Sequence, residues 1–301
     1  RKMKMSNFVV PLIHIPEISS NTRFPPVDVA RSLVDALQKS GFLLITTPFV
    51  PKDLQTRALA AASEFLESES PTVISHPTDP KAYAMLESKD GILKDSAVLS
   101  EYFTAMEKTK NAVLQCISVG LDLESNYFTR LHSENNNAMR LLHYQVGTEL
   151  TGNRCKEHSD YGTVTILLTN GISGLEAYHH EQWLPVPHVE GALVVNVGSL
   201  LSDWTGGKLL ATLHRVAGPT SKGSHTPLSS LLDAVSSPRF SIAFFADPNK
   251  EVSATLKALD AGTNAKEMSV AEYIQWRSGG SDKNRSGLAF TNCEEERLGE
   301  E

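Results

Sequence analysis

Two histidines and one aspartate carry the most informative chemistry in this sequence. His158 and Asp160 are two residues apart, so in an extended strand their side chains point to the same side. His214 follows later, inside an apolar run of the chain. Two imidazoles and one carboxylate can occupy one face of a metal ion and leave the opposite face open, which is the ligand set of non-haem Fe(II) centres. The sequence therefore predicts a metal site on these three residues.

Arg239 and Ser241 form a second chemical feature, at the start of a predicted strand that runs to residue 246. The two side chains share one strand face, and the apolar residues around them indicate a strand that is buried on both faces. A buried guanidinium needs an anion, and its planar fork beside a hydroxyl suits a carboxylate. The phenol of Tyr144, on another predicted strand, could complete the same carboxylate site.

Each of these features has a simpler explanation when it stands alone. A His-x-Asp pair is expected about 0.4 times by chance in a chain of this composition, and an isolated histidine or tyrosine in an apolar strand most often serves packing. The order of these residues along the chain favours a shared site over these simpler explanations. The His-x-Asp pair precedes one predicted strand, His214 lies in a later one, and Arg239 opens the last one. We therefore interpret these residues as parts of one site.

The N-terminal part of the chain is expected to be rich in helices. Apolar residues repeat at three and four positions in residues 28–40, 54–66 and 95–117. Asp95 is the expected cap of the third of these helices. Residues 8–15 and 42–46 predict strands, the first at a sheet edge because it contains Pro11. Residues 68–94 have no clear period and are expected to form loops.

From residue 139 onward the sequence changes to short β-rich runs separated by Gly, Pro and Asn. The predicted strands are residues 139–146, 164–169, 175–178, 183–186, 192–197, 209–216 and 240–246. Short strands with turn signals between them favour a sandwich or a barrel. The insert at residues 218–238 is long for a connection and is expected to be a mobile lid that orders over a substrate. Residues 254–278 are again expected to be helical.

The chain as a whole has the composition of an ordinary globular protein. It has 301 residues, of which 41% are hydrophobic and 21% charged, and a net charge of −7. The negative charge argues against nucleic-acid partners and against binding to an anionic membrane. No apolar run reaches the roughly 20 residues of a membrane-spanning helix. Three scattered cysteines and no apolar signal core predict a cytoplasmic protein, which we expect to be a monomer.

The ordered motifs resemble those of the plant and fungal type of 2-oxoglutarate- and Fe(II)-dependent dioxygenases, the superfamily that includes isopenicillin N synthase. Val10-Pro-Leu-Ile13 and Gly41-Phe42 resemble the family's N-terminal region, and Arg140-Leu-Leu-His-Tyr144 resembles its first barrel strand. The other motifs follow in the family's order: His158-Ser-Asp160-Tyr-Gly-Thr-Val-Thr, Gly174-Leu-Glu, Trp183-Leu-Pro-Val, Val195-Asn-Val-Gly198, His214-Arg-Val and Arg239-Phe-Ser241. The resemblance covers nearly the whole chain.

This resemblance implies an α+β fold with a mainly β core. The core would be a double-stranded β-helix, a cupin-like jelly roll, flanked by helices and preceded by a helical N-terminal region. We expect a helix-rich region at residues 1–135, a catalytic core at 136–250 that contains the insert 218–238, and a C-terminal helix and tail at 251–301.

The same resemblance implies Fe(II) as the cofactor, with 2-oxoglutarate and O2 as co-substrates. The histidines and the aspartate would bind the iron, and Arg239, Ser241 and Tyr144 would bind the far carboxylate of 2-oxoglutarate. The implied reaction decarboxylates 2-oxoglutarate to succinate. It oxidises a small molecule by hydroxylation, desaturation or oxidative cyclisation, in specialised metabolism.

Substrate-facing residues are expected on the same strand faces as the site. Arg140 shares the inward face with Tyr144, and Phe245 and Asp247 lie at even offsets from Arg239. Arg140 would suit an acidic substrate and Asp247 an amine, so an amino acid derivative is one candidate substrate. Either residue can instead belong to a structural ion pair.

Three alternatives stay open at this level. An oxidase of the same fold could use Arg239 and Ser241 to hold its own substrate and need no 2-oxoglutarate. A jelly-roll binding protein could keep the pocket without catalysis. A zinc hydrolase also uses two histidines and a carboxylate, but it needs a general base near the metal. Glu157, beside the motif, is expected to point to the opposite strand face.

Overall fold

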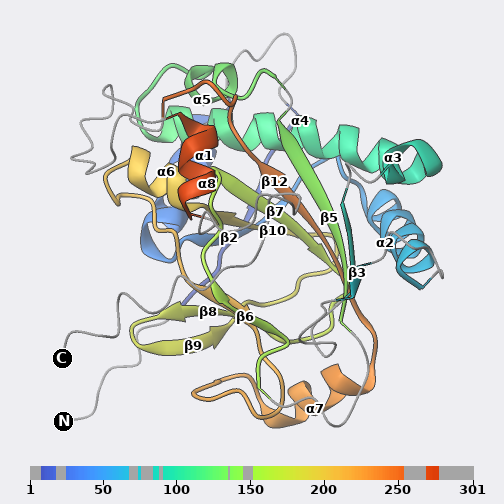
Figure 1. The fold of residues 1–301 in the computed structure, drawn as a ribbon. Helices are drawn as coiled ribbons and strands as arrows, with labels where there is room; N and C mark the ends of the chain where they lie inside the picture. Colours follow the sequence, from blue (N-terminus) through green and yellow to red (C-terminus); the bar gives the residue numbers. More distant parts are fainter. Residues whose placement is uncertain are drawn as a thin grey trace, which may run out of the picture.

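The computed structural model describes residues 8–17, 25–67, 74–75, 84–87, 91–134, 136–144, 152–253 and 269–277. Within these residues a larger and a smaller β-sheet lie one above the other, and most helices gather on the far side of the larger sheet (Figure 1). None of the described helices is both long and apolar enough to cross a membrane.

The larger sheet has eight strands in the order β1-β2-β10-β7-β12-β5-β4-β3, and the smaller sheet has four in the order β6-β11-β8-β9. The strands are β1 (Leu12–His14), β2 (Phe42–Thr46), β3 (Ile74–Ser75), β4 (Ala84–Glu87), β5 (Asn137–Tyr144), β6 (Cys155–His158), β7 (Val164–Thr169), β8 (Leu175–His179), β9 (Gln182–Pro185), β10 (Leu193–Val197), β11 (His214–Val216) and β12 (Arg239–Ala246). Strands far apart in the sequence pair in both sheets, as in a jelly roll. The predicted α+β fold with a double-stranded β-helix core is confirmed.

Eight helices accompany the sheets in the described part of the chain. They are α1 (Val27–Lys39), α2 (Lys52–Glu67), α3 (Ile92–Asp95), α4 (Ala97–Gly120), α5 (Tyr127–Arg130), α6 (Ser199–Trp204), α7 (Leu228–Ser236) and α8 (Val270–Arg277). The apolar faces of α1, α2 and α4 pack on the outer face of the larger sheet and form the main hydrophobic core with it.

Strand β12 lies at the centre of the larger sheet, between β5 and β7, and its side chains alternate between two environments. Phe240, Ile242 and Phe244 belong to the core under the helices. The alternate residues line the space between the two sheets: Arg239, Ser241, Ala243 and Phe245. The prediction that this strand is buried on both faces is confirmed, and its inward row is polar at one end.

Most predicted elements are present, with local differences. Strands β2 and β7 have the predicted bounds, and β1 is an edge strand as Pro11 indicated. The predicted cap at Asp95 is wrong, because the hydroxyl of Ser96 accepts the hydrogen bond from the backbone of Leu99 instead. The strand predicted from residue 209 begins only at His214.

Two segments expected to be irregular contain regular structure. Residues 68–94 include β3, β4 and most of α3, and β4 extends the larger sheet by pairing with β5. The insert 218–238 carries helix α7, whose Leu231, Ala234 and Val235 are buried. The apolar residues of α7 follow a helical spacing that the Ser- and Pro-rich composition of the insert concealed.

The expected C-terminal helix is confirmed over α8, whereas residues 254–268 lie outside the described part of the chain. The hydroxyl of Tyr273 donates to Asp203 Oδ2 at 2.5 Å and so joins α8 to α6. The division at residues 135 and 250 stays a prediction. Strands β1 to β4 extend the sheet of the proposed core across the first of these boundaries.

Candidate metal centre and carboxylate pocket

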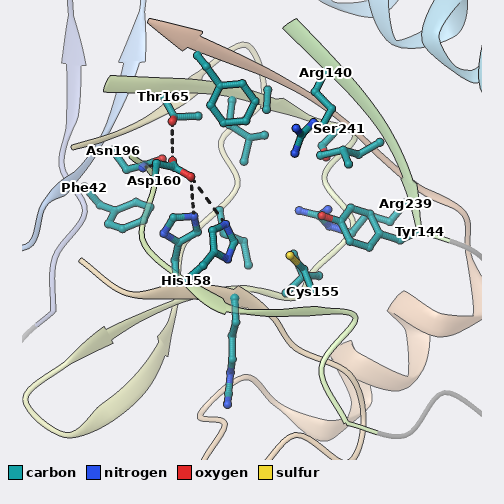
Figure 2. A pocket seen from close by; sticks show the side chains of 18 residues that line it. Phe42, Arg140, Tyr144, Cys155, His158, Asp160, Thr165, Asn196, Arg239 and Ser241 are labelled. Atoms are coloured by element: carbon teal, nitrogen blue, oxygen red, sulfur yellow. Dashed lines mark hydrogen bonds and ion pairs between the residues drawn. The ribbon is translucent and has the colours of Figure 1, made fainter. Parts of the chain in front are cut away.

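A cavity between the two sheets collects the residues that the sequence singled out. About 570 Å³ of space lies among its lining side chains, part of it open to solvent. Figure 2 shows Asp160 and His158 on one side of this space, and Arg239, Ser241 and Tyr144 gathered on the other.

The register of the larger sheet explains why Arg239, Ser241 and Tyr144 gather on one side of the cavity. Arg239 lies opposite Tyr144 in the antiparallel pair of β12 and β5, and Ser241 lies opposite Leu142. Because directly opposed residues share a sheet face, these side chains project into the cavity together. The same register places Arg140 opposite Ala243, further along the cavity wall.

The three candidate metal ligands converge from strands β6 and β11 of the smaller sheet and from the turn that follows β6. His158, the last residue of β6, pairs with His214, the first residue of β11. Asp160 Oδ1 lies 3.7 Å from His158 Nε2 and 3.8 Å from His214 Nε2. One ligand atom from each residue lies within 4.8 Å of the other two. Ligand atoms on one face of an ion with bonds of about 2 Å lie about 3 Å apart, so this donor set can hold one divalent metal when the side chains close around it.

Backbone carbonyl groups orient both imidazoles. His158 Nδ1 lies 2.8 Å from the carbonyl oxygen of Lys156, and His214 Nδ1 lies 3.2 Å from that of Thr212. A carbonyl can only accept, so each Nδ1 donates and each Nε2 is the nitrogen left for a metal. Both Nε2 atoms face Asp160, the arrangement that a metal shared by the three residues requires.

Asp160 is held by two hydrogen bonds to a single oxygen. Thr165 Oγ1 donates to Oδ2 at 2.5 Å and Asn196 Nδ2 donates to the same oxygen at 2.7 Å. Burial acts to raise the pKa of Asp160, but the nearby imidazoles and then these hydrogen bonds outweigh it. The pKa of Asp160 therefore lies below its ordinary value, and the side chain is a carboxylate at neutral pH.

The opposite side of the cavity carries a buried guanidinium and a buried hydroxyl that each have one atom without a hydrogen-bond partner among the described residues. Arg239 and Ser241 are each 1% exposed, and neither Arg239 Nη1 nor Ser241 Oγ has a hydrogen-bond partner among the described residues. Arg239 Nε donates to the carbonyl oxygen of Ile172 at 3.3 Å, which fixes the fork. Leaving such groups unpaired is costly, and a carboxylate would satisfy both, so this wall fits the far end of 2-oxoglutarate.

Arg154, which the sequence analysis did not select, supports this wall from the residue before β6. Its Nη2 donates to the carbonyl oxygen of Tyr144 at 2.9 Å and its Nη1 to that of Ala234 at 3.0 Å. Burial, and then the charge of Arg239, lower the pKa of Arg154 to about 10, so it stays charged at neutral pH. Burial also raises the pKa of Tyr144, which keeps its phenol neutral and able to donate.

The three candidate substrate residues are placed differently from one another. Arg140 and Phe245 both line the cavity, with the Arg140 guanidinium 5.4 Å from the centre of the Phe245 ring. Asp247 does not line it but lies behind the metal-ligand turn, where a Cβ on Gly162 would collide with Asp247 Oδ1. The structure therefore brings two of the three together at the cavity.

Strand pairing builds one row of cavity residues, of which only Phe245 was selected from the sequence. Phe42 of β2 lies opposite Asn196 of β10, Asn196 lies opposite Thr165 of β7, and Thr165 lies opposite Phe245 of β12. The Phe42 ring also contacts His214 edge-on, with 5.7 Å between the ring centres. The motifs that contain Phe42 and Asn196 were visible in the sequence, but their position beside the metal ligands was not.

Glu157 does not offer a general base to the candidate metal site. Its carboxylate accepts a hydrogen bond from Arg215 Nη1 at 3.0 Å. Arg215 also donates from Nε to Glu176 at 2.9 Å, and Glu176 is fully buried. The interpretation of Glu157 as pointing away from His158 agrees with this ion-pair network.

Comparison with known proteins gives one family. Residues 126–248 match the model of the 2OG-Fe(II) oxygenase superfamily. The chain is 30% identical to the 2-oxoglutarate-Fe(II) type oxidoreductase ppzD of Metarhizium rileyi, over 51% of this chain and 43% of that protein. It is 28% identical to the proline hydroxylase buaE of Petromyces alliaceus, over 67% of this chain and 65% of that protein. The chain thus spans about half the length of several curated relatives it matches.

Solved structures show the same fold at low sequence identity. A full-length protein of Neurospora crassa, solved in complex with alpha-KG, superposes with a TM-score of 0.74 at 20% identity and covers 91% of this chain and 97% of its own. The dioxygenase for auxin oxidation 1 of Arabidopsis thaliana, solved as a 2-oxoglutarate complex, superposes with a TM-score of 0.65 at 17% identity, over 81% and 94%.

The matched residues 126–248 include both groups of candidate site residues, and these groups fit the metal and the co-substrate for which the superfamily is named. Through residues 126–248, the chain is similar to the 2OG-Fe(II) oxygenase superfamily.

Proposed function

We propose that this protein is a 2-oxoglutarate-dependent Fe(II) oxygenase that oxidises a small molecule. One observation carries the proposal: a His-Asp-His cluster lines the same cavity as a buried Arg-Ser pair, in which Arg239 Nη1 and Ser241 Oγ have no hydrogen-bond partner among the described residues. The first group suits Fe(II) and the second suits a carboxylate. A superfamily member with only one of the two groups would lack either the metal or the co-substrate.

In this proposal each residue has a defined task. His158, Asp160 and His214 hold Fe(II), which supplies the activation of O2 when it is bound. Arg239 and Ser241 bind and orient the far carboxylate of 2-oxoglutarate, and the neutral phenol of Tyr144 contributes a further donor. The apolar residues between the two groups exclude water, which strengthens the electrostatic contacts inside the cavity.

The substrate is proposed to meet Arg140 and Phe245. The Arg140 guanidinium over the Phe245 ring offers a cation and an aromatic face on the cavity wall, which suits an acidic or carbonyl-bearing molecule. An amino acid derivative fits this description, and the relative named a proline hydroxylase supports it. The fungal relatives favour a role in specialised metabolism. Asp247 stays a weaker candidate, because it lies outside the cavity lining.

We further propose that the protein works as a monomer in the cytoplasm. The composition supports this, and both cysteines in the described part of the chain, Cys116 and Cys155, are free and buried. A reducing compartment would keep such thiols and an Fe(II) ion reduced.

The main alternative is an oxidase of the same fold that binds its own substrate on Arg239 and Ser241. One relative is named 1-aminocyclopropane-1-carboxylate oxidase homolog 1, at 27% identity over 91% of this chain. A non-catalytic binding protein is the other alternative. Anaerobic reconstitution with Fe(II), followed by O2, 2-oxoglutarate and a panel of amino acid derivatives and other small acids, separates the three. Substrate-stimulated O2 uptake that needs 2-oxoglutarate supports the proposal, and no uptake with any panel member favours the binding protein.

A further inference from the structure

We propose that Thr165 and Asn196 are positioning residues that turn Asp160 into a one-oxygen metal ligand. This inference rests on the proposed metal site. Both donors bind Asp160 Oδ2, at 2.5 Å from Thr165 and 2.7 Å from Asn196 (Figure 2). Oδ1 is the oxygen that faces the two imidazole Nε2 atoms, at 3.7 and 3.8 Å. The two oxygens of one carboxylate therefore have separate partners.

The two donors come from the rigid part of the fold. Thr165 and Asn196 lie directly opposite each other in the antiparallel pair of β7 and β10, near the centre of the larger sheet. Thr165 is 6% exposed and Asn196 is 4% exposed, so both donors are shielded from water. A ligand held from central strands is placed more precisely than one held from loops.

The backbone of the metal-ligand turn is fixed independently of these side chains. The amide of Ser199 donates to the carbonyl oxygen of Asp160 at 2.7 Å, and the amide of Leu200 donates to that of Tyr161 at 3.0 Å. Gly198 packs so closely on Gly162 that a Cβ there would collide with the Gly162 carbonyl oxygen. With the backbone held, rotation of the Asp160 side chain is the remaining freedom.

Thr165 and Asn196 remove that freedom. A carboxylate oxygen accepts about two hydrogen bonds, so two donors use the capacity of Oδ2 and leave Oδ1 for the metal. Without them the carboxylate could rotate, and Oδ2 could approach the ion and take a position that the open face of the site needs. Partners of this kind orient metal ligands, and their loss typically weakens metal affinity about 10- to 100-fold.

The test measures metal affinity without 2-oxoglutarate, substrate or turnover. Mn(II) replaces Fe(II) because it is stable in air, and free Mn(II) is quantified by electron paramagnetic resonance during titration of the purified protein. Thr165→Val keeps the shape of threonine and removes the hydroxyl, and Asn196→Ala removes the amide. We expect each to weaken Mn(II) binding about 10- to 100-fold. Thr165→Ser restores the hydroxyl and should bind within about threefold of the wild type.

The matched control is Thr169→Val on the same strand. The Thr169 hydroxyl lies 3.4 Å from His188 Nδ1, and the residue does not line the cavity. This variant should bind Mn(II) like the wild type. Thermal unfolding without metal shows whether each variant folds. If Asn196→Ala does not fold, the comparison of Thr165→Val with Thr165→Ser still decides the proposal.

His214→Ala distinguishes a failure of the positioning role from a failure of the metal site itself. Loss of Mn(II) binding in His214→Ala with near-wild-type binding in Thr165→Val and Asn196→Ala overturns the positioning role and leaves the metal site intact. Wild-type binding in His214→Ala overturns the metal site and this inference with it. Equal loss in Thr169→Val and Thr165→Val also overturns the inference, because the effect would then not depend on Asp160.

Discussion

The guanidinium of Arg239 lies 4.6 Å from the centre of the Tyr144 ring, and the two residues are directly opposite each other in the pairing of β12 with β5. The ring supports the guanidinium by a cation–π contact while Nη1 stays without a hydrogen-bond partner among the described residues. Arg239 is therefore held in place before any ligand arrives. Such preorganisation lowers the entropy lost when a carboxylate binds.

Arg239→Lys should raise the KM for 2-oxoglutarate about tenfold to a hundredfold. Lysine keeps the charge but has no planar fork and stacks less well on the Tyr144 ring, so at least one charge-assisted hydrogen bond is lost. The KM for the primary substrate should change little. Steady-state kinetics with each substrate varied in turn measures both values. Ser241→Ala should shift the same constant in the same direction by a smaller factor.

The reverse pattern would favour the oxidase. If Arg239 binds the primary substrate, Arg239→Lys raises the KM for that substrate and leaves any response to 2-oxoglutarate unchanged.

Glu176→Ala should lower the free energy of unfolding by about 3 kcal/mol. The fully buried carboxylate accepts hydrogen bonds from Arg215, Ser224 and Thr226. Its removal deprives the buried guanidinium of Arg215 of one of its two carboxylate partners among the described residues and leaves it with the partly exposed Glu157. Glu157→Ala is the matched comparison. The Glu157 side chain is 29% exposed, so its loss should lower the free energy of unfolding by about 1 kcal/mol or less. Denaturant unfolding measures both, and equal effects would contradict the network.

The expected lid movement of the insert 218–238 stays a prediction, and the contacts of the insert specify how to test it. Arg215 Nη2 donates to the carbonyl oxygen of Lys222 at 2.9 Å, and Glu176 anchors Ser224 and Thr226. If the insert opens, these contacts break, so Glu176→Ala should increase protease cleavage between residues 218 and 227. Substrate should reduce the cleavage. Cleavage that is the same with and without substrate would argue against a lid.

Asp247→Asn should stabilise the metal-free protein in a pH-dependent way. Burial, and then the carboxylate of Asp160, raise the pKa of Asp247 to about 7 in the folded state. The folded state then binds more protons than the unfolded state between about pH 4 and 7, so Asp247 destabilises the fold increasingly as the pH rises. The gain from asparagine should grow by roughly 1 kcal/mol per pH unit and level off above about pH 7. Denaturant unfolding of both proteins at several pH values, with a chelator present, measures this difference in the free energy of unfolding. A difference that does not vary with pH would contradict the raised pKa of Asp247.

Local patterns were sufficient to predict helix α1 and strand β12. The apolar spacing of α1 and the alternation along β12 identify a helix and a central strand without any knowledge of their neighbours. His214 and Arg239 were predicted for the same reason, because each stands in a run whose structure follows from its own residues. Both residues line the same cavity in the structure.

The remaining parts depend on contacts between distant segments. Strand β6 was missed because Lys156 and Glu157 interrupt the apolar pattern that predicts strands. Thr165 and Asn196 are ordinary polar residues in their own strands, and only the register of β7 with β10 brings both to Asp160. Side-chain direction placed Phe245 correctly but failed for Asp247, because the strand ends at Ala246 and the alternation ends with it.

Succinate formation tests the central claim most directly. The protein is reconstituted with Fe(II) and supplied with O2 and its best substrate from the panel, with and without 2-oxoglutarate, and succinate and oxidised product are quantified together. Our account predicts succinate and product in equal amounts, no product without 2-oxoglutarate, and neither compound from His214→Ala. Full product formation in buffer free of 2-oxoglutarate, with no succinate, would contradict the account and identify an oxidase that uses Arg239 for its own substrate.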